Sequence, residues 1–442
     1  MNQLAKASRP VRPSQLEGGN PPSSALRPRS STSSLSASPS SVVRPPTLQV
    51  ALLTGGGDKP YALGLAAALT SADISVDFIG SDDLAAPEVR DNPRVNFLNL
   101  RGDQSRNVNL AKKVTRVVSY YWRLIRYAAA AQPKLFHILW NNKFEVFDRT
   151  VLMFYYKLLG KRVIFTAHNV NARKRDGHDS FLNRFSLQIQ YQQVDHIFVH
   201  TDAMKRELLS DFGVHEAKVT VIPFGINNTV ANTALTPLEA KQQLGLSPTD
   251  KTILFFGNIA PYKGLEYLIS AFGELLKKDR NYRLVIAGRP KASEDYLRRI
   301  HEAIARSGAR DRLIAKLQYI PDDETELYFK AADVLALPYT RIFQSGVLFL
   351  GYSFGLPAIA SNVGSLREEI IEGKTGFVFK AQDSSDLVRV IGKYFESDLF
   401  TGSSSRRNEI REYANQRYSW DKVVMITTAV YSKLDSLAKS HG

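Results

Sequence analysis

Two side chains of this sequence stand at points where a parallel α/β fold places its chemistry. His168 directly follows the apolar run RVIFTA, and Lys263 lies in the loop after the run TILFFG. Such runs are typical of buried parallel strands, whose carboxyl ends border the ligand crevice of an open sheet. There an imidazole can act on a bound ligand, and an ammonium group can attract a phosphate. The ordinary alternatives are a structural histidine and a solvated surface lysine.

A turn of small polar residues, QSG at 344–346, opens directly onto an apolar helical run. The first N–H groups of a helix have no partner within it, and the helix dipole favours negative charge there. Small side chains leave these groups accessible to a phosphate. Facing Lys263 across one pocket, they would hold a diphosphate by one cation and several amides. The residues expected to take part are Gln344, Ser345, Gly346 and Val347.

Three consecutive glycines, Gly55, Gly56 and Gly57, follow the first apolar run of the chain. Glycine lets the backbone turn tightly or approach a ligand closely, and the sequence leaves both uses open. The segment does not match the dinucleotide-binding fingerprint GxGxxG. We therefore expect a strand-to-helix turn at the edge of the crevice, with Gly56 and Gly57 as candidate ligand contacts.

Apolar runs alternate with helical patterns along two stretches of chain, separated by a polar connector. This alternation predicts α/β domains with mostly parallel sheets covered by helices on both faces. We expect two Rossmann-like doubly wound domains that face each other across a cleft. The expected boundaries are a disordered Ser/Pro/Arg-rich tail at 1–46, a first domain at 47–224, a linker at 225–250, a second domain at 251–415, and a helix at 416–438 that crosses back to the first domain.

The composition excludes some chemistry and indicates an anionic partner. With no cysteine among 442 residues, the chain has no disulfide, thiolate metal ligand or cysteine nucleophile. A formal net charge of +15 favours nucleic acid, a phosphorylated substrate or an anionic membrane as partner. RNP, KH and helix-turn-helix patterns are lacking, so we expect no nucleic-acid binding. Because no apolar run reaches about 18 residues, we expect no membrane-spanning helix.

Six motifs occur in one order: TAHN, VIPFGIN, FFGNIAPYKGLEYLISAF, LVIAG, AADVLALPY and QSGVLFLGYSFGLPAIASNVGSLREEIIEGKTGFVF. Together they resemble the GT-B glycosyltransferases of family 4. The final YSWDKVVMITTAVYSKL is similar to that family's crossing-back helix, so the resemblance covers about residues 48–438. It implies a nucleoside-diphosphate sugar donor in the second domain and an acceptor in the first, with no metal and no other cofactor.

The resemblance also implies roles for individual residues. His168 matches the family's cleft histidine, which orients or polarises the transferred sugar. Lys263 and the amides of the QSG turn would neutralise the diphosphate leaving group, and backbone around Tyr319 and Ile320 would meet the nucleobase. The full expected set is catalytic His168 and Lys263, with substrate contacts at Gly56, Gly57, Asn169, Gly257, Asn258, Gly288, Tyr319, Ile320, Gln344, Ser345, Gly346 and Val347.

Two features depart from the family's usual pattern. Asn258 stands where the family usually has an arginine, so Lys263 is the one sure cation of the donor site. Ile342 and Leu350 occupy the positions of two glutamates that usually meet the sugar and the ribose. A subset of the family with a QSGV helix lacks these glutamates, and we assign the chain to it. The usual basis for assigning the donor sugar and the stereochemistry is then absent.

Residues 112–130 form a basic amphipathic helical pattern. Either this helix is an interfacial anchor on anionic lipid, or its apolar face packs on the sheet while its basic face is solvated. Packing is the commoner case, and we expect it here. By periodicity the basic face carries Lys113, Arg116, Tyr120, Arg123 and Tyr127, and the apolar face carries Val114, Val117, Val118, Tyr121, Leu124, Ile125 and Ala128.

The leading hypothesis is a hexosyltransferase that acts on a glycan or polyprenyl-diphosphate-linked acceptor in exopolysaccharide or surface-glycan assembly. It would be cytoplasmic, in peripheral contact with the anionic inner face of the plasma membrane, which would account for the net charge. Two alternatives remain open: another GT-B enzyme such as an epimerase, and a non-catalytic sugar-nucleotide-binding partner of another transferase. The absence of the two glutamates motivates the second alternative.

Overall fold

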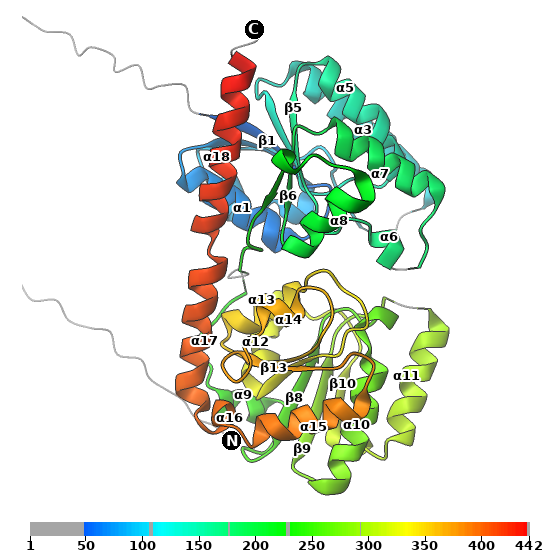
Figure 1. Ribbon diagram of the computed structural model, residues 1–442, viewed down its shortest axis with the longest axis vertical. Coiled ribbons are helices and arrows are strands. Elements are labelled where there is room, and N and C mark those ends of the chain that lie inside the picture. Colours follow the sequence, from blue (N-terminus) through cyan, green and yellow to red (C-terminus); the bar gives the residue numbers. More distant parts are fainter. Residues whose placement is uncertain (1–47, 106–108, 176, 227–229, 292, 440–442) are drawn as a thin grey trace, which may run out of the picture. The chain divides into compact units, whose positions relative to one another are not determined.

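A computed structural model describes residues 48–105, 109–175, 177–226, 230–291 and 293–439. In these residues the chain forms two sheets, of seven and six strands, in which all neighbouring strands are parallel, as the alternating pattern predicts. Figure 1 shows helices packed around both sheets. The tail predicted at 1–46 lies outside the described residues.

The first sheet has the strand order β3-β2-β1-β4-β5-β6-β7. Alternate side chains of β1 enter two separate cores: Val50 and Leu52 pack with α1 and α18, whereas Ala51 and Leu53 pack with α3, α5 and α7. This burial on both faces explains why β1 is apolar at every position after Gln49. The strands are β1 (Gln49–Leu53), β2 (Ser75–Ile79), β3 (Val95–Leu98), β4 (Leu135–Ile138), β5 (Arg162–Thr166), β6 (His196–Val199) and β7 (Val219–Val221). The helices are α1 (Lys59–Ser71), α2 (Pro87–Arg90), α3 (Leu110–Ala130), α4 (Glu145–Phe147), α5 (Met153–Leu158), α6 (Ala172–Arg175), α7 (Phe181–Gln193) and α8 (Asp202–Phe212).

The second sheet has the order β10-β9-β8-β11-β12-β13 and one continuous core. Its strands are β8 (Lys251–Phe256), β9 (Tyr282–Ala287), β10 (Leu313–Lys316), β11 (Val334–Leu337), β12 (Ala358–Ser361) and β13 (Gly376–Phe379). Its helices are α9 (Pro237–Gln243), α10 (Leu265–Lys278), α11 (Glu294–Arg306), α12 (Asp322–Ala331), α13 (Gly346–Ser353), α14 (Leu366–Glu369), α15 (Ser384–Phe395), α16 (Asp398–Thr401) and α17 (Ser403–Tyr418). The strand order reverses direction between β1 and β4 in the first sheet and between β8 and β11 in the second. Doubly wound folds bind their ligands at such points.

The last helix, α18 (Trp420–Lys439), packs against α1 of the first sheet (Figure 1). Val423, Tyr431 and Leu434 enter the core that α1 and the first sheet share. The Tyr431 hydroxyl lies 2.5 Å from Nδ1 of the buried His137 on β4. The chain therefore completes the core of its first sheet with residues from its last helix.

Several elements differ from the sequence-based expectation. The segment expected to be a linker contains α9, whose capping box joins Thr236 and Glu239 and which packs on α12 of the second sheet. The helix expected at 416–438 is α18, which begins at Trp420, and residues 403–418 form the separate helix α17. The helical segment that ends in α5 contains a π-helical turn at Asp148–Leu152.

Helix α3 does not pack as expected. Its buried residues are Tyr120, Tyr121, Leu124 and Ala128, a stripe at the boundary of the two predicted faces. Two residues of the predicted packing face do not reach the core: Val114 is 55% exposed and Val118 is 61% exposed. The expectation that the apolar face packs and the basic face is solvated is therefore wrong for the first half of the helix.

Candidate active site

A pocket of about 320 Å³ is bordered by loops that follow the carboxyl ends of strands in both sheets. On the first sheet these loops follow β1, β5 and β7; on the second they follow β8 and β11. Such a position, outside the carboxyl ends of parallel strands, is the usual ligand site of doubly wound folds. The lining residues are Asp58, Pro60, Tyr61, Asn169, Phe224, Gly225, Asn258, Tyr262, Lys263, Ile342, Gln344, Ser345, Gly346, Val347, Leu350 and Trp420.

Lys263 lines this pocket although it is only 5% exposed. Its Nζ donates a hydrogen bond of 2.6 Å to the Tyr339 hydroxyl and lies 3.8 Å from the centroid of that ring. The Tyr339 hydroxyl in turn lies 3.2 Å from Ser345 Oγ, so a hydrogen-bonded chain links the ammonium group to the residue that precedes α13. The alternative of a solvated surface lysine is wrong. A cation in such low-dielectric surroundings attracts an anionic ligand more strongly than a solvated one does.

The N-terminus of α13 opens onto the same pocket. Helix α13 begins at Gly346, and its N-cap residue Ser345 makes no side-chain capping hydrogen bond. The amides of Gly346 and Val347 belong to the first turn, whose N–H groups carry partial positive charge. Lys263 and this turn thus border one pocket, as the sequence predicts.

Two apolar side chains border the start of α13, at the positions where the family resemblance led us to look for glutamates. Ile342 and Leu350 both line the pocket. Between them, the amide group of Gln344 is buried, and neither its Nε2 nor its Oε1 has a hydrogen-bond partner among the described residues. Buried polar atoms are normally paired, so this side chain has the capacity to bind a polar ligand. A glutamine amide offers two donors and an acceptor.

His168 follows β5, and its imidazole is in contact with aromatic side chains. Its ring stacks on Trp140 with centroids 4.1 Å apart and planes 4° from parallel. Tyr61, which also lines the pocket, meets the imidazole edge-on at 4.7 Å. Asn169, the next residue, lines the pocket directly. The imidazole is therefore held beside the pocket by two rings.

A second histidine fixes the tautomer of His168. Nδ1 of His200 lies 3.3 Å from the Ile222 carbonyl oxygen, which can only accept, so this nitrogen carries the proton. Nε2 of His200 then accepts from Nδ1–H of His168 at 3.0 Å. Nε2 of His168 is left as an acceptor, and it has no partner among the described residues. Burial, with the neighbouring His200 and His137, lowers the pKa of His168 well below its ordinary value, so the ring is neutral at pH 7.

The glycine loop packs on protein rather than on open space. A Cβ at Gly57 would lie 1.9 Å from the Trp140 ring, and one at Gly55 would lie 2.0 Å from the Trp140 carbonyl oxygen. At Gly56, where φ is +78°, a Cβ would lie 2.0 Å from Nη1 of Arg101. The loop follows β1 and leads into α1, whose first helical turn is capped by the Asp58 carboxylate through the Tyr61 amide at 3.0 Å. The glycines therefore form a tight turn that packs on Trp140 and Arg101, and the predicted ligand contacts of Gly56 and Gly57 stay predictions.

Six predicted substrate contacts do not line the pocket within the described chain, and neither does His168: the six are Gly56, Gly57, Gly257, Gly288, Tyr319 and Ile320. A Cβ at Gly288 would lie 1.7 Å from the carbonyl oxygen of Gly257, so these two glycines let the ends of β8 and β9 approach each other. Tyr319 is 60% exposed and Ile320 is buried, in the connection from β10 to α12. Their predicted contacts with donor and nucleobase stay predictions. Seven of the predicted residues do meet in the pocket: Asn169, Asn258, Lys263, Gln344, Ser345, Gly346 and Val347.

Sequence reasoning missed several residues of the site. His200 follows β6 just as His168 follows β5, so the signal that singled out His168 was present there too. Tyr61, Trp140 and Trp420 gave no local signal, because their roles arise from contacts between distant segments. Trp420, for example, lies against Gly64 and Gly225 and donates its indole N–H to the Ile226 carbonyl at 3.1 Å.

A search of the described residues gives no group of three or more His, Asp or Glu side chains placed to hold a metal ion. The same part of the chain contains no helix both long and apolar enough to cross a membrane.

Comparisons with known proteins place the chain in a family. Residues 238–417 match the family model of glycosyl transferases group 1, and residues 55–229 match that of glycosyltransferase family 4. The chain is 26% identical over 289 residues to a D-inositol 3-phosphate glycosyltransferase of Corynebacterium urealyticum, which covers 62% of this chain and 67% of that protein. Across such relatives the matched part spans about half to two thirds of their length.

Solved structures share the fold at low sequence identity. Sucrose-phosphate synthase from Thermosynechococcus elongatus superposes with a TM-score of 0.70 at 19% identity, over 88% of this chain and 100% of that one. HepE of Anabaena in complex with UDP-glucose gives a TM-score of 0.68 at 16% identity, over 87% and 100%. The chain therefore has the GT-B fold and belongs to the family 4 glycosyltransferases, the glycosyl transferases of group 1.

Proposed function

We propose that this protein transfers a hexose from a nucleoside-diphosphate sugar to a hydroxyl group of an acceptor, without a metal ion. The observation that carries the proposal is the buried chain from Lys263 through Tyr339 to Ser345 at the N-terminus of α13. In the reaction the bond between the sugar C1 and the β-phosphate oxygen breaks, and its electron pair stays on the phosphate. A new bond forms between C1 and the acceptor oxygen, which loses its proton. Lys263 and the α13 amides stabilise the charge that grows on the leaving diphosphate.

His168 would bind the transferred sugar rather than neutralise charge. Because its pKa is held well below neutral by burial, the ring offers Nε2 as a hydrogen-bond acceptor at pH 7. His200 keeps that nitrogen unprotonated by accepting the proton of Nδ1. A sugar hydroxyl that donates to Nε2 would satisfy this buried atom and fix the orientation of the ring at the reacting carbon.

The pocket suggests how a donor is recognised without the two glutamates. We assign the chain to the subset of the family that lacks them, and we propose that Gln344 meets donor hydroxyl groups with its unpaired amide. Ile342 and Leu350 would form an apolar wall beside it. The HepE structures contain UDP or UDP-glucose, and this supports a UDP-sugar as donor.

We propose that the acceptor is a glycan or a polyprenyl-diphosphate-linked sugar at the cytoplasmic face of the plasma membrane, in surface-glycan assembly. Exposed apolar side chains gather on helices that cover one face of the first sheet. They stand beside exposed cations of α3, namely Lys112, Arg123 and Arg126. An apolar surface with basic neighbours suits an anionic bilayer. The apolar residues are Leu110, Val114, Val118, Trp122, Phe144, Val151, Phe154, Leu158, Phe181, Leu182 and Phe185.

A donor screen tests the proposal. UDP-, GDP- and TDP-sugars are compared for their effect on Tm, and the preferred sugar is then assayed for nucleotide release. We expect a UDP-sugar to raise Tm, because a ligand of the native state stabilises it. His168→Ala should lower nucleotide release by ~10²-fold, as loss of one active-site hydrogen-bonding group does. His178→Ala is the matched control, since His178 does not line the pocket in the described chain.

The second candidate is a sugar-nucleotide-binding protein without activity of its own. The apolar residues at 342 and 350 favour it, because they remove the carboxylates that relatives use on the donor. It predicts a Tm shift with a UDP-sugar but no nucleotide release in either the unmodified protein or the His168→Ala variant. A GT-B epimerase would instead consume the UDP-sugar and return an isomeric UDP-sugar.

A further inference from the structure

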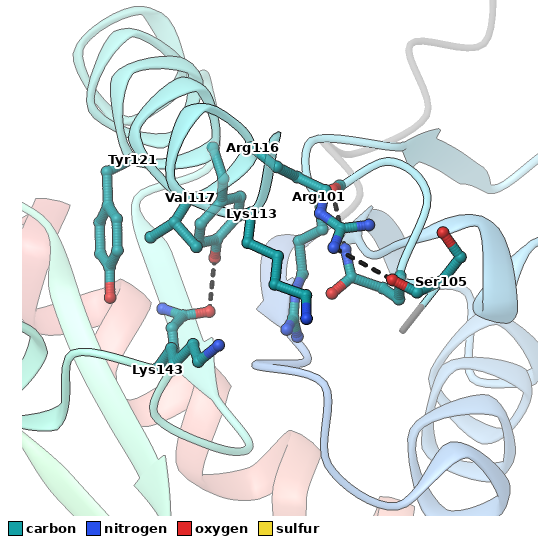
Figure 2. A pocket seen from close by; sticks show the side chains of 10 residues that line it. Arg101, Ser105, Lys113, Arg116, Val117, Tyr121 and Lys143 are labelled. Carbon is teal, nitrogen blue, oxygen red and sulfur yellow. Dashed lines mark hydrogen bonds between the residues drawn. The ribbon is translucent and has the colours of Figure 1, made fainter. Parts of the chain in front are cut away.

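A second cavity, of about 400 Å³, lies in the first sheet's half of the molecule and shares no lining residue with the donor pocket. It is bordered by α3, by the loop that follows β3 and by the loop that follows β4. Figure 2 shows Lys113 reaching down from α3, with Arg101 and Lys143 also directed at the space between these segments. The lining residues are Arg101, Gln104, Ser105, Lys113, Arg116, Val117, Tyr120, Tyr121, Asn142 and Lys143.

The lining carries four cations, and no carboxylate is among the described residues that form it. Arg116 is occupied: it donates to the Asp103 and Ser105 carbonyls, and its Nη1 lies 3.7 Å from the Asp103 carboxylate. Within the described chain, Lys113, Lys143 and Arg101 form no salt bridge. Three positive charges thus converge on one cavity without a protein counter-ion.

Among these cations, Arg101 gives the strongest indication of a ligand. Its Nη1 is buried and has no hydrogen-bond partner among the described residues. Its guanidinium lies 5.7 Å from the centroid of the Tyr120 ring and packs on Gly56. The buried Arg149 also has an unpaired nitrogen, its Nε, but its charge is paired with Glu145 at 3.0 Å. A buried, unpaired guanidinium N–H is costly unless a ligand satisfies it.

The glycine loop separates this cavity from the catalytic surroundings. Gly56 touches Arg101 on one side, and Gly57 touches Trp140, whose ring stacks on His168. Beyond the loop, Asp58 lines the donor pocket. A molecule with an anionic group in the cavity would therefore extend past the glycine loop toward His168.

We propose that this cavity binds the phosphate or diphosphate group of the acceptor, with Arg101, Lys113 and Lys143 as its ligands. The proposal rests on the function proposed above and names the class of its second substrate: a phosphorylated sugar or sugar-linked lipid. Guanidinium and ammonium groups are the usual ligands of phosphate, and the cavity is wide enough for a diphosphate. The attached sugar would present its hydroxyl group to the donor across the glycine loop.

Inorganic pyrophosphate is the probe, titrated calorimetrically into the full-length protein that is already saturated with UDP. Saturation with UDP keeps pyrophosphate out of the donor pocket. We expect one pyrophosphate site, weakened roughly tenfold or more by Lys113→Ala and by Lys143→Ala, as the loss of a charge-assisted contact implies. The control is Lys112→Ala, which removes the same charge from an exposed neighbouring position of α3 and should change the affinity less than about twofold.

Three outcomes decide the matter. If Lys112→Ala and Lys113→Ala weaken pyrophosphate binding equally, the affinity depends only on net charge, and the proposal is overturned. Failure of pyrophosphate to bind the UDP-saturated protein would also overturn it. If UDP itself does not bind, the proposed function fails, and the same titration without UDP still tests the cavity.

A second titration separates the two sources of a diphosphate. Farnesyl diphosphate carries the same anionic group on a prenyl chain. Tighter binding than pyrophosphate would assign the cavity to a lipid-linked acceptor, and equal binding to a soluble phosphorylated one. Either result upholds the proposal provided that Lys113→Ala weakens both probes.

Discussion

Replacing Lys263 by methionine should separate catalysis from stability. Methionine matches the lysine side chain as far as Cε and fills most of the same buried space, but it removes the ammonium group that donates to the Tyr339 hydroxyl at 2.6 Å. We expect turnover of a UDP-sugar to fall by ~10²- to 10³-fold, because removal of one preorganised donor to a developing oxyanion has that effect. Over the same change, the ligand-free protein should keep its Tm or gain a few degrees.

The magnitudes follow from burial. Two unit charges about 4 Å apart interact by about 4 kcal/mol at an effective dielectric constant of 20, which sets the upper range of the catalytic loss. Lys263 is 5% exposed, and burial of an ammonium group opposes folding by several kcal/mol. The hydrogen bond that methionine loses stabilises the fold by about 1.5–3 kcal/mol. The two stability terms therefore cancel or leave a small gain, whereas the catalytic loss has no compensation.

Two assays check this pair of effects. Nucleotide release gives kcat and KM, and thermal unfolding gives Tm with and without UDP. At one hundred times its Kd, UDP should stabilise the unmodified protein by about 2.7 kcal/mol, and a tenfold weaker affinity would leave about 1.4 kcal/mol. Lys277→Met, on the exposed face of α10, is the control. Turnover within tenfold of the unmodified enzyme, at an unchanged UDP affinity, would refute the assignment of Lys263 to the leaving group.

Three further perturbations address other parts of the molecule. Burial lowers the pKa of His137 to about 3 and that of His200 to about 4. Below pH 6.5 these histidines are therefore protonated in the unfolded chain but still neutral in the folded protein. The free energy of unfolding should change little above pH 6.5 and should fall by about 1 kcal/mol per histidine between pH 6.5 and pH 5.5. The midpoint of urea unfolding measures this loss, and an unchanged midpoint would contradict the prediction. Gly56→Ala should displace Arg101 and weaken pyrophosphate binding roughly tenfold with UDP affinity intact, and equal loss of both would show a general collapse of the loop. Trp122→Glu should reduce sedimentation with phosphatidylglycerol vesicles several-fold without altering nucleotide release, and undiminished sedimentation would exclude α3 from the contact.

The fold could be predicted because its signals are local. Runs such as RVIFTA and TILFFG are apolar on both faces of the strand, and the structure gives β5 and β8 there. The donor side of the pocket was predictable for the same reason. Lys263 and the QSG turn each lie in the connection from a strand to the next helix, and parallel strands bring their carboxyl ends to one edge.

What the sequence did not predict depends on contacts between distant segments. The 3.6-residue period of α3 identified its two faces, but the buried stripe runs along their boundary through Tyr121 and Leu124. Which stripe of α3 is buried depends on how the helix is placed on the sheet, and periodicity alone does not give that placement. Likewise, the cationic cavity needs Arg101, Lys113 and Lys143 from three segments, and each looks like an ordinary surface cation in the sequence.

The packing of α18 into the first core has a consequence for the order of synthesis. The bond between His137 and Tyr431 joins residues 294 positions apart, and Val423 and Leu434 close the same core. At roughly 5–20 residues per second, a ribosome needs on the order of 10–40 s to pass from β7 to α18. During that interval the face of the sheet that α18 covers stays open on the nascent chain. The core of the second sheet is made of consecutive segments, so that sheet can fold before α18 is synthesised. The uncovered face of the first sheet is therefore where we expect chaperones to bind the nascent chain.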